Sequence, residues 1–371
     1  MHADVIIEKI ILKNFRSHKN LYLNSSKPNV VLFGDNGSGK TNILEAISLF
    51  SPGRGMRGSK FQEILNTKTK ENIFEINLFL KYSNGTINLH KKFINSEKKE
   101  SYFLINDEKV NSGELLDYLK IIWITPVMEK VMLQSHSEKR IFFDRLIVNV
   151  ERDYLKHYRK LQKLLKERLH IIQNKAEDED WVNLIESEIA FLSYEVIKMR
   201  DQVIKSINNE LTEVSEPFTS CKIEYVYIKE IDSLLKDKDF FVNSYQSMLK
   251  SKRILDGEIG STSVSINKLI INIWKYGDNG VEAKNCSTGE QKSMLIAIIL
   301  SVAGLIKKNN FNKAPIILID EAMAHLDDRH RVQLLKELKN LNSQVWYTGV
   351  SKELFSSIDD QTIFFEVKNN I

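Results

Sequence analysis

The order of apolar and polar positions near the start of the chain predicts two strands followed by a helix. Residues 5–12 and 30–33 are apolar stretches of strand length, and the second stretch stops at Gly34. From residue 41 to residue 48 the apolar side chains recur at helical spacing. The chain therefore predicts the local order of strand, glycine-rich loop and helix.

The pattern changes twice further along the chain. Short β-rich stretches between residues 73 and 104 predict an antiparallel meander. Residues 137–256 then carry long helical patterns rich in lysine, glutamate and leucine, with one strand-like interruption at 222–227. The last third alternates apolar helices with strands, which indicates a parallel sheet flanked by helices.

We therefore predict an α/β protein whose head is assembled from both ends of the chain. A mixed sheet flanked by helices, together with the antiparallel β meander, would form this head, and a mainly helical second lobe would be inserted into it. The expected boundaries are residues 1–136 for the first part of the head, 137–256 for the helical lobe and 257–371 for the second part of the head.

Composition excludes several classes of protein. The 371 residues are 42% hydrophobic and 27% charged, and the formal net charge of +4 permits an acidic partner without requiring one. Cys221 and Cys286 lie far apart with no Cys or His cluster beside them, which argues against a disulfide framework and a structural zinc. No apolar run reaches the roughly 18 residues that span a bilayer. We expect a soluble cytoplasmic protein without a membrane partner.

The glycine-rich loop carries the first candidate chemistry. It fits the phosphate-loop pattern GxxxxGKS/T in full, with Gly34, Asp35, Asn36, Gly37, Ser38, Gly39, Lys40 and Thr41. Backbone N–H groups at the start of the following helix can face the phosphates of ATP, where the helix dipole favours anions. Lys40 is expected to reach the β- and γ-phosphates, and the Thr41 hydroxyl to hold Mg²⁺. A chance glycine turn is the alternative, and the flanking strand and helix argue against it.

An apolar strand that ends in two acids, Asp320 and Glu321, supplies the second candidate. In nucleotide hydrolases with a phosphate loop, one acid holds the metal and another group orients or deprotonates the nucleophile. We assign metal binding to Asp320 together with Thr41, and catalytic roles to Lys40, Asp320 and Glu321. A strand ending in acids is commonly an ordinary solvated strand end, so this assignment depends on its pairing with the phosphate loop.

The residues after Cys286 resemble the SxGQQ signature of the ABC ATPases and stand directly before an apolar helix. In that family Ser287 and Gly289 would face the γ-phosphate held by the opposite subunit, and the start of the helix would add its dipole. Glu290 departs from the more common glutamine. A helix cap formed by Ser287 is an alternative explanation of the same residues.

Further motifs resemble the RecF family of ABC/SMC-type ATPases. Residues 14–17 are similar to that family's opening, where an arginine at the position of Arg16 approaches the nucleotide phosphates. Residues 324–327 are similar to its D-loop, which implies that Asp327 lies near a dimer interface. Thr348 falls at its switch position beside the γ-phosphate, and a purely structural role at a strand end is the alternative. The resemblance covers nearly the whole chain.

What the resemblance implies is an ATP-dependent homodimer. Two ATP molecules with Mg²⁺ would lie between the phosphate loop of one subunit and the signature of the other, and slow hydrolysis by a weak DNA-dependent ATPase would reopen this clamp. The resemblance also implies sequence-independent binding at gapped DNA or single-strand/double-strand junctions, in recombinational DNA repair and replication restart. RecR and RecO would be partners in loading RecA.

Two basic stretches are candidates for the DNA contact. The first stretch is part of a basic run that continues to Arg168. Four of its side chains lie on one face of an expected helix, namely those of Arg152, Lys156, Arg159 and Lys163. Such a face can follow a phosphate backbone in a salt-sensitive way, and a solvated lysine-rich helix is the alternative. The second lies near the phosphate loop and comprises Arg54, Arg57 and Lys60.

Two other functions stay open at this point. The ATPase subunit of a membrane transporter would carry the same nucleotide motifs, although the long helical insertion and the lack of an obvious coupling segment argue against it. An ATP-dependent nuclease of the overcoming-lysogenisation type would need an additional carboxylate-rich metal domain. We expect none after Glu321, because few residues follow it.

Overall fold

The computed structural model describes residues 5–82, 85–174, 179–277, 280–358 and 360–368. Its contacts divide the chain into two compact units. Unit 1 comprises Met1–Lys130, Glu213–Thr219 and Thr288–Ile371, and unit 2 comprises Val131–Thr212 and Ser220–Ser287. Unit 1 is therefore assembled from both ends of the chain. Residues 257–287, which the sequence placed with the head, group with unit 2, because a strand in this stretch pairs with the strand-like interruption of the helical lobe.

A parallel sheet forms the centre of unit 1. Its strand order is β13-β3-β12-β11-β8, and every neighbouring pair is parallel. The strands are β3 (Asn29–Phe33), β8 (Ile121–Ile124), β11 (Ile316–Ile319), β12 (Val345–Gly349) and β13 (Thr362–Glu366). All residues of β8, β11 and β12 are buried, which is why they read as continuous apolar runs rather than alternating ones. The α/β class predicted from the sequence is confirmed.

The second sheet of unit 1 is antiparallel, with the order β2-β1-β4-β5-β6-β7. Its strands are β1 (Val5–Phe15), β2 (His18–Asn24), β4 (Ile73–Tyr82), β5 (Gly85–Ile94), β6 (Glu100–Ile105) and β7 (Glu108–Val110). Burial alternates along β4, because successive side chains of a strand point to opposite faces. The buried amide of Gln344 joins this sheet to the parallel one: its Oε1 accepts from the N–H of Ile7 at 2.8 Å, and its Nε2 donates to the carbonyls of Ile7 and Lys27.

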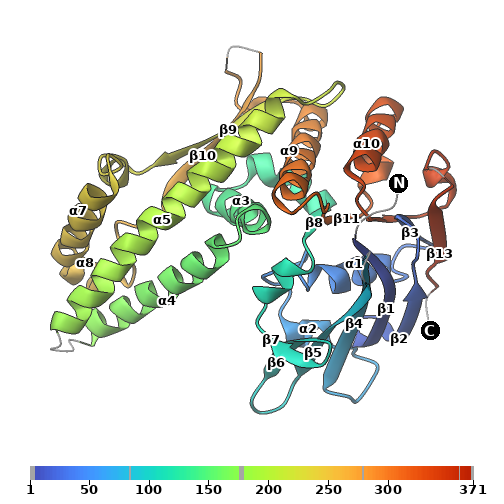
Figure 1. Ribbon diagram of the computed structural model, residues 1–371, viewed down its shortest axis with the longest axis horizontal. Coiled ribbons are helices and arrows are strands. Elements are labelled where there is room, and N and C mark those ends of the chain that lie inside the picture. The colour runs from blue at the N-terminus through green and yellow to red at the C-terminus, as the bar shows by residue number, and fades with distance from the viewer. Residues whose placement is uncertain (1–4, 83–84, 175–178, 278–279, 359, 369–371) are drawn as a thin grey trace. The chain divides into compact units, whose positions relative to one another are not determined.

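The helical elements of unit 1 stand beside these sheets (Figure 1). They include α1 (Lys40–Ser48), α2 (Phe61–Ile64), α9 (Thr288–Asn309) and α10 (Asp328–Leu341), with short 3-10 turns η1 (Glu114–Asp117), η4 (Ala322–His325) and η5 (Glu353–Phe355). Among the described helices, α9 has the length and composition that could cross a membrane, but 72% of its most apolar window is buried inside the protein. Its apolarity is thus explained by its position in the core.

Unit 2 is mainly helical and also contains a two-stranded antiparallel sheet, β9 (Cys221–Tyr227) with β10 (Leu269–Lys275). Its helices are α3 (His136–Val150), α4 (Tyr154–Gln173), α5 (Glu179–Thr212), α6 (Lys229–Asp232), α7 (Lys238–Ser251) and α8 (Arg253–Ile259), and the turns are η2 (Pro126–Leu133), which begins in unit 1, and η3 (Ala283–Asn285). Helices α4 and α5 lie side by side along much of their length (Figure 1). Ser135 begins α3 with a capping box, since its hydroxyl accepts from the N–H of Glu138 while the Glu138 carboxylate accepts from the N–H of Ser135.

Candidate nucleotide-binding site

The phosphate loop runs from the end of β3 to the start of α1. Gly34, Gly37 and Gly39 have φ angles of 140°, 83° and 102°, a region that residues with a Cβ rarely adopt. Gly39 is the N-cap of α1 and provides no side-chain cap, so the first N–H groups of the helix remain directed at the loop. The Lys40 ammonium donates to the carbonyls of Gly34 at 2.7 Å and Asp35 at 2.8 Å. The loop is therefore closed around the lysine.

A histidine that the sequence did not single out supports this loop. The His18 imidazole is buried, and its Nε2 lies 3.1 Å from the carbonyl oxygen of Gly39. Burial lowers the pKa of His18, although the hydrogen bond to Gly39 acts in the opposite direction. The neutral ring, protonated at Nε2, can donate to this carbonyl. The signal in the sequence was its position, since His18 begins β2 directly after the short turn that follows β1.

Replacing Gly39 by alanine is expected to lower both stability and nucleotide affinity. A Cβ at this position would lie 2.6 Å from Ser17 Oγ and 2.7 Å from His18 Nε2, in a backbone region with φ of 102°. The strain costs on the order of 1–3 kcal/mol. Thermal unfolding and titration with a fluorescent ATP analogue would measure the two effects.

Gly37→Ala is the matched control, because Gly37 also has a positive φ but its added Cβ would meet no atom within 4 Å. If Gly39→Ala were no more harmful than Gly37→Ala, contact with His18 would not be what requires glycine.

The carboxyl ends of β11 and β12 bring the candidate metal site to the phosphate loop. The Thr41 hydroxyl donates to Asp320 Oδ1 at 2.8 Å, and the Thr348 hydroxyl donates to the same oxygen at 2.8 Å. Thr348 Oγ1 also accepts from the N–H of Glu321 at 2.9 Å. The Thr348 hydroxyl thus holds the carboxylate of Asp320 and the backbone N–H of Glu321, and segments that are far apart in the sequence meet at one point.

Glu321 has a backbone conformation that is uncommon for its residue type. Its φ angle is 52°, in the left-handed region, and it stands between the end of β11 and the turn η4. Its side chain is half-buried, and no hydrogen bond to its carboxylate is found in the part of the chain that the structure describes. The backbone of Glu321 is thus held next to the candidate metal site, and no salt bridge of its side chain is found among the described residues.

These residues fit a nucleotide with a divalent metal ion. Gly34 allows the phosphate loop to pack against the backbone after β13, since a Cβ there would lie 2.5 Å from the carbonyl oxygen of Val367. Thr41 and Asp320 supply the hydroxyl and carboxylate oxygens that Mg²⁺ prefers, and they are already in contact. Lys40 places a cation at the loop. The loop, the hydroxyl and the acid are the parts that a phosphate-loop hydrolase requires.

Comparison with known proteins agrees with this geometry. The family model of the RecF/RecN/SMC N terminal domain matches residues 6–371. The chain is 32% identical over 350 residues to the DNA replication and repair protein RecF of Rickettsia felis, covering 94% of each chain, and 34% identical over 349 residues to that of Rickettsia prowazekii, covering 93% and 94%. The chain belongs to the RecF family. Its relatives are named for DNA replication and repair, and the transporter alternative is not favoured.

Solved structures share the fold of this RecF-family chain. The structure of the recombination mediator protein RecF with ATP in the RecFOR pathway has a TM-score of 0.85 at 22% identity and covers 100% of this chain and 98% of that one. The Smc head domain of Pyrococcus furiosus with an extended coiled coil, bound to the C-terminal domain of ScpA, has a TM-score of 0.55 at 18% identity and covers 98% and 94%. The head architecture expected from the motifs is confirmed.

In this RecF-family structure Arg16 is held by a buried acid. Its Nε and Nη2 donate to the two carboxylate oxygens of Glu45 on α1, at 2.9 and 2.6 Å, and Nη1 donates to the Glu63 carbonyl at 2.8 Å. Arg57 reaches Glu45 Oε2 at 3.3 Å. The Glu45 side chain is fully buried, so its charge depends on these two arginines. The signal for Glu45 in the sequence is an acid among the apolar residues of α1.

Two signature residues and Asp327 of the D-loop lie on the surface of this RecF-family chain. Ser287 and Gly289 are exposed at the start of α9, and a Cβ at Gly289 would meet nothing within 4 Å. Asp327 is the N-cap of α10 and accepts from the N–H of His330 at 2.9 Å. The pKa of Asp327 is lowered mainly by this hydrogen bond and, to a smaller extent, by a second hydrogen bond from the His330 side chain. Contacts of these residues with a second subunit remain predictions.

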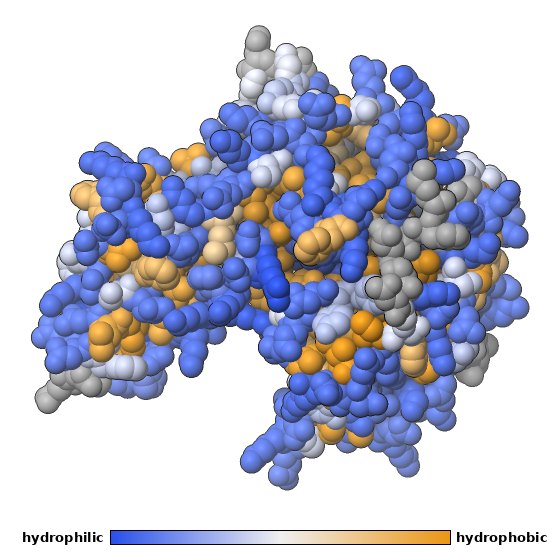
Figure 2. Space-filling model, in the orientation of Figure 1, coloured by the Kyte–Doolittle hydropathy of each residue, from blue (hydrophilic) through white to orange (hydrophobic). Residues whose placement is uncertain are grey.

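The two basic stretches differ in their surroundings. On and just before α4, Arg152, Lys156, Arg159 and Lys163 are all exposed, and the face of unit 2 drawn in Figure 2 is mainly hydrophilic with small apolar patches. Arg168, the last member of the predicted run, is instead fully buried in ion pairs with Glu186 and Asp256. It therefore contributes no surface charge.

The loop after α1 exposes Arg54, Arg57 and Lys60. Arg54 and Lys60 line a cavity of about 290 Å³ together with Lys99, Phe61 and Phe93. Three cations thus converge on one hollow in unit 1. Arg57, by contrast, is tied to Asn42 and Glu45, so the basic loop is physically connected to α1 and through Glu45 to Arg16.

Proposed function

We propose that this chain is an ATP-dependent DNA-binding clamp that acts as a switch in recombinational DNA repair and replication restart. The observation that carries the proposal is the contact of Thr41, Asp320 and Thr348 at the phosphate loop of a RecF-family fold. Two hydroxyls and a carboxylate meet where the phosphates would lie. A surface strand end does not require such an arrangement.

Each residue of the site has a role in this proposal. Lys40 exchanges its loop carbonyls for phosphate oxygens, and Thr41 with Asp320 holds Mg²⁺, which supplies charge neutralisation at the phosphates when bound. Thr348 keeps Asp320 in place and fixes the backbone of Glu321. Glu321 then orients the attacking water and accepts its proton. Arg16 adds a second cation when it leaves Glu45 for the phosphates.

Dimerisation follows from the exposure of the signature. Ser287 and Gly289 are accessible at the start of a 22-residue helix, where a partner subunit's γ-phosphate could be bound by backbone N–H groups. In this proposal ATP-bound subunits close into a homodimer and slow hydrolysis separates them. The switch depends on a higher affinity of ATP for the closed state.

The DNA and protein partners are proposed from the relatives. Curated relatives are named DNA replication and repair protein RecF, and one structural neighbour is described as a recombination mediator in the RecFOR pathway. We propose that this chain binds gapped DNA or single-strand/double-strand junctions without reading their sequence, and that this DNA stimulates its weak ATPase activity. In the cytoplasm it would work with RecR and RecO in loading RecA.

Reversing the charge of Arg54 and Lys60 together is expected to weaken DNA binding and its dependence on salt. Each phosphate contact contributes about 0.9 to the magnitude of the slope of log affinity against log salt concentration. Loss of two contacts should therefore make the slope of the double variant shallower by about two. Fluorescence anisotropy with gapped DNA at several salt concentrations measures this slope.

The matched control is the double reversal Lys19→Glu with Lys70→Glu, which makes the same change in net charge at exposed positions outside the loop. If the loop variant kept the wild-type slope while reversal of Lys156 and Lys163 lowered it, the contact would lie on α4 instead.

Size-exclusion chromatography with light scattering tests the proposed function as a whole. The wild-type chain is expected to form a dimer with ATP and Mg²⁺ and to retain gapped DNA. A monomer under every condition, without DNA retention at low salt, would rule the clamp out. A permease recovered in a pulldown from membranes would revive the transporter alternative.

A further inference from the structure

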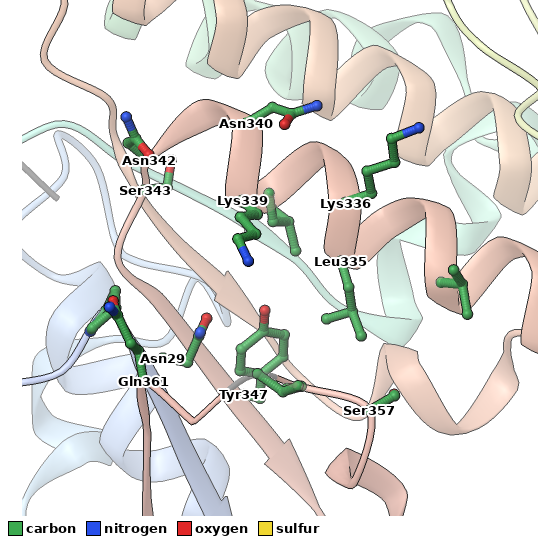
Figure 3. A pocket seen from close by; sticks show the side chains of 14 residues that line it. Asn29, Leu335, Lys336, Lys339, Asn340, Asn342, Ser343, Tyr347, Ser357 and Gln361 are labelled. Atoms are coloured by element: carbon green, nitrogen blue, oxygen red, sulfur yellow. The ribbon is translucent and has the colours of Figure 1, made fainter. Parts of the chain in front are cut away.

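Two cavities of unit 1 differ in the placement of their charged side chains. The larger has a volume of about 660 Å³ and lies between α10 and the parallel sheet. Figure 3 shows the Lys336 side chain directed away from Tyr347 there, so the lysines of this cavity do not converge on one point. The smaller, the basic-loop hollow, has a volume of about 290 Å³ and is lined by residues that include Arg54, Lys60, Phe61, Phe93, Lys99 and Ser101.

The basic-loop hollow carries an excess of positive charge. Arg54 and Lys60 come from the loop after α1, and Lys99 stands directly before β6. All three residues are exposed, and no ion pair of their side chains is found within the described ranges. No aspartate or glutamate lines the hollow. Cations without a neighbouring acid produce a positive potential, which attracts phosphate groups.

Aromatic side chains form the apolar part of the same hollow. Phe93 of β5 is 3% exposed, whereas Phe61 of α2 is half-buried and therefore reaches the surface. The centroids of these two rings lie 5.6 Å apart, and Phe61 also contacts the ring of Phe74 at 6.3 Å. Phe61 is thus a partly exposed ring that buried rings hold in place.

A buried lysine supports the hollow from within the protein. Lys91 of β5 is 1% exposed, and its Nζ lies 4.4 Å from the ring centroid of Phe61 and 3.8 Å from that of Phe103. The same ammonium donates to Ser101 Oγ at 3.3 Å. Because that oxygen accepts from the lysine, the hydroxyl proton of Ser101 can be donated to a ligand in the hollow. The ring and the hydroxyl are therefore both positioned before any ligand binds, which lowers the entropy cost of binding.

The combination of these features fits a nucleotide better than an inorganic anion. An aromatic surface adds nothing to the binding of phosphate alone, and cations add little to the binding of an uncharged ring. A base joined to a phosphate backbone uses both, as in proteins that bind single strands. In duplex DNA the bases are paired and stacked, so a base can enter a hollow only where it is unpaired or has left the stack.

We propose that the basic-loop hollow binds one unpaired nucleotide of single-stranded DNA beside a duplex. Its base packs against Phe61, and an acceptor on the base edge receives the hydroxyl proton of Ser101. The flanking phosphates lie at Arg54, Lys60 and Lys99. This inference rests on the DNA-binding function proposed above and adds a physical reason for a preference for gaps and junctions, because the hollow requires an unpaired base.

Two gapped DNAs test the base contact by fluorescence anisotropy on the full chain with ATP and Mg²⁺. One carries thymines in the gap, and the other carries abasic residues, which keep the phosphates. The wild type should bind the abasic gap about tenfold more weakly, as expected for loss of one base–aromatic contact. Phe61→Leu should bind the thymine gap about tenfold more weakly and lose little more with the abasic gap. Phe311→Leu, at a site that is 94% exposed and outside the hollow, should behave as the wild type.

Charge reversal at Lys99 tests the phosphate contact separately. Lys99→Glu should make the slope of log affinity against log salt concentration shallower by about one for both gapped DNAs, since one phosphate contact is lost. Lys19→Glu, an equal change of charge at an exposed position outside the hollow, should leave the slope unchanged. A wild-type slope in Lys99→Glu would contradict the proposed position of the backbone.

The remaining outcomes separate this inference from the function on which it rests. If the wild type bound neither gapped DNA nor duplex, the DNA-binding function would fail and the inference with it. Equal binding of the thymine and abasic gaps would overturn the inference alone, and because this comparison uses the wild type, a folding defect cannot obscure it. A full abasic penalty in Phe61→Leu would place the base elsewhere. Thymidine monophosphate that bound as tightly as gapped DNA would assign the hollow to a free nucleotide, which also overturns the inference.

Discussion

Glu321→Gln is expected to slow ATP hydrolysis by about 10²- to 10⁴-fold, the usual contribution of a general base, while ATP still binds. Glutamine keeps the shape of the side chain but cannot accept a proton from water. The contacts that form the candidate metal site do not involve the Glu321 side chain, because Thr41 and Thr348 both donate to Asp320. Thr348 holds only the backbone N–H of Glu321, which the substitution leaves in place.

Single-turnover hydrolysis and light scattering together measure this effect. The Glu321→Gln variant should hydrolyse ATP slowly and stay dimeric in the presence of ATP. This dimer should also retain gapped DNA for longer than the wild-type dimer does. Asp328→Asn is a suitable control, since it removes the charge of an exposed acid close in sequence. Wild-type turnover in Glu321→Gln would show that another group activates the water, and loss of ATP binding would mean that the acid holds the nucleotide.

The parts of the site that could be predicted from the sequence are those fixed by local chain order. A strand, a glycine-rich loop and a helix determine where the phosphate loop lies, and Asp320 follows directly after a strand of the same parallel sheet. Because parallel strands end at one edge of a sheet, Thr348 at the end of β12 also arrives beside Asp320. Spacing and register are sufficient for these three elements.

The contacts that the sequence did not predict depend on tertiary packing. Glu45 sits on a helix whose pattern is apolar, and only the fold shows that Arg16 and Arg57 approach it from separate segments. The strand β10 was placed with the head because it follows the helical lobe in the chain, but its partner is β9. The pattern of apolar residues within one segment does not identify the distant segment with which it pairs.

Arg168 shows the same limit on the other candidate surface. Its neighbours on α4 are exposed lysines, and the sequence alone does not distinguish it from them. In the structure its guanidinium donates to Glu186 at 2.8 Å, to Asp256 at 2.7 Å and to the carbonyl of Leu249 at 2.7 Å. One side chain of α4 thus joins α5, α7 and α8 within unit 2.

Arg168→Ala is expected to destabilise unit 2 by about 3–5 kcal/mol, the usual cost of removing one partner from a buried ion pair. Asp256 would bear most of this cost, because Arg253 still donates to Glu186 at 2.6 and 3.0 Å. Among the described residues, the Asp256 carboxylate would keep the N–H of Ser263 alone as a donor. Lys166→Ala, an exposed change on the same helix, should alter stability by less than about 0.5 kcal/mol. Thermal unfolding and hydrogen exchange of the α4 and α5 amides measure both.

A double variant separates loss of charge pairing from loss of packing. Arg168→Met keeps an aliphatic side chain but leaves Asp256 charged, and adding Asp256→Asn removes that buried charge. If unpaired charge causes the instability, the double variant should be more stable than Arg168→Met, with a favourable coupling energy in the mutant cycle. If the two changes simply added, Arg168 would stabilise unit 2 through its packing and its bond to Leu249, and the ion pair would contribute little.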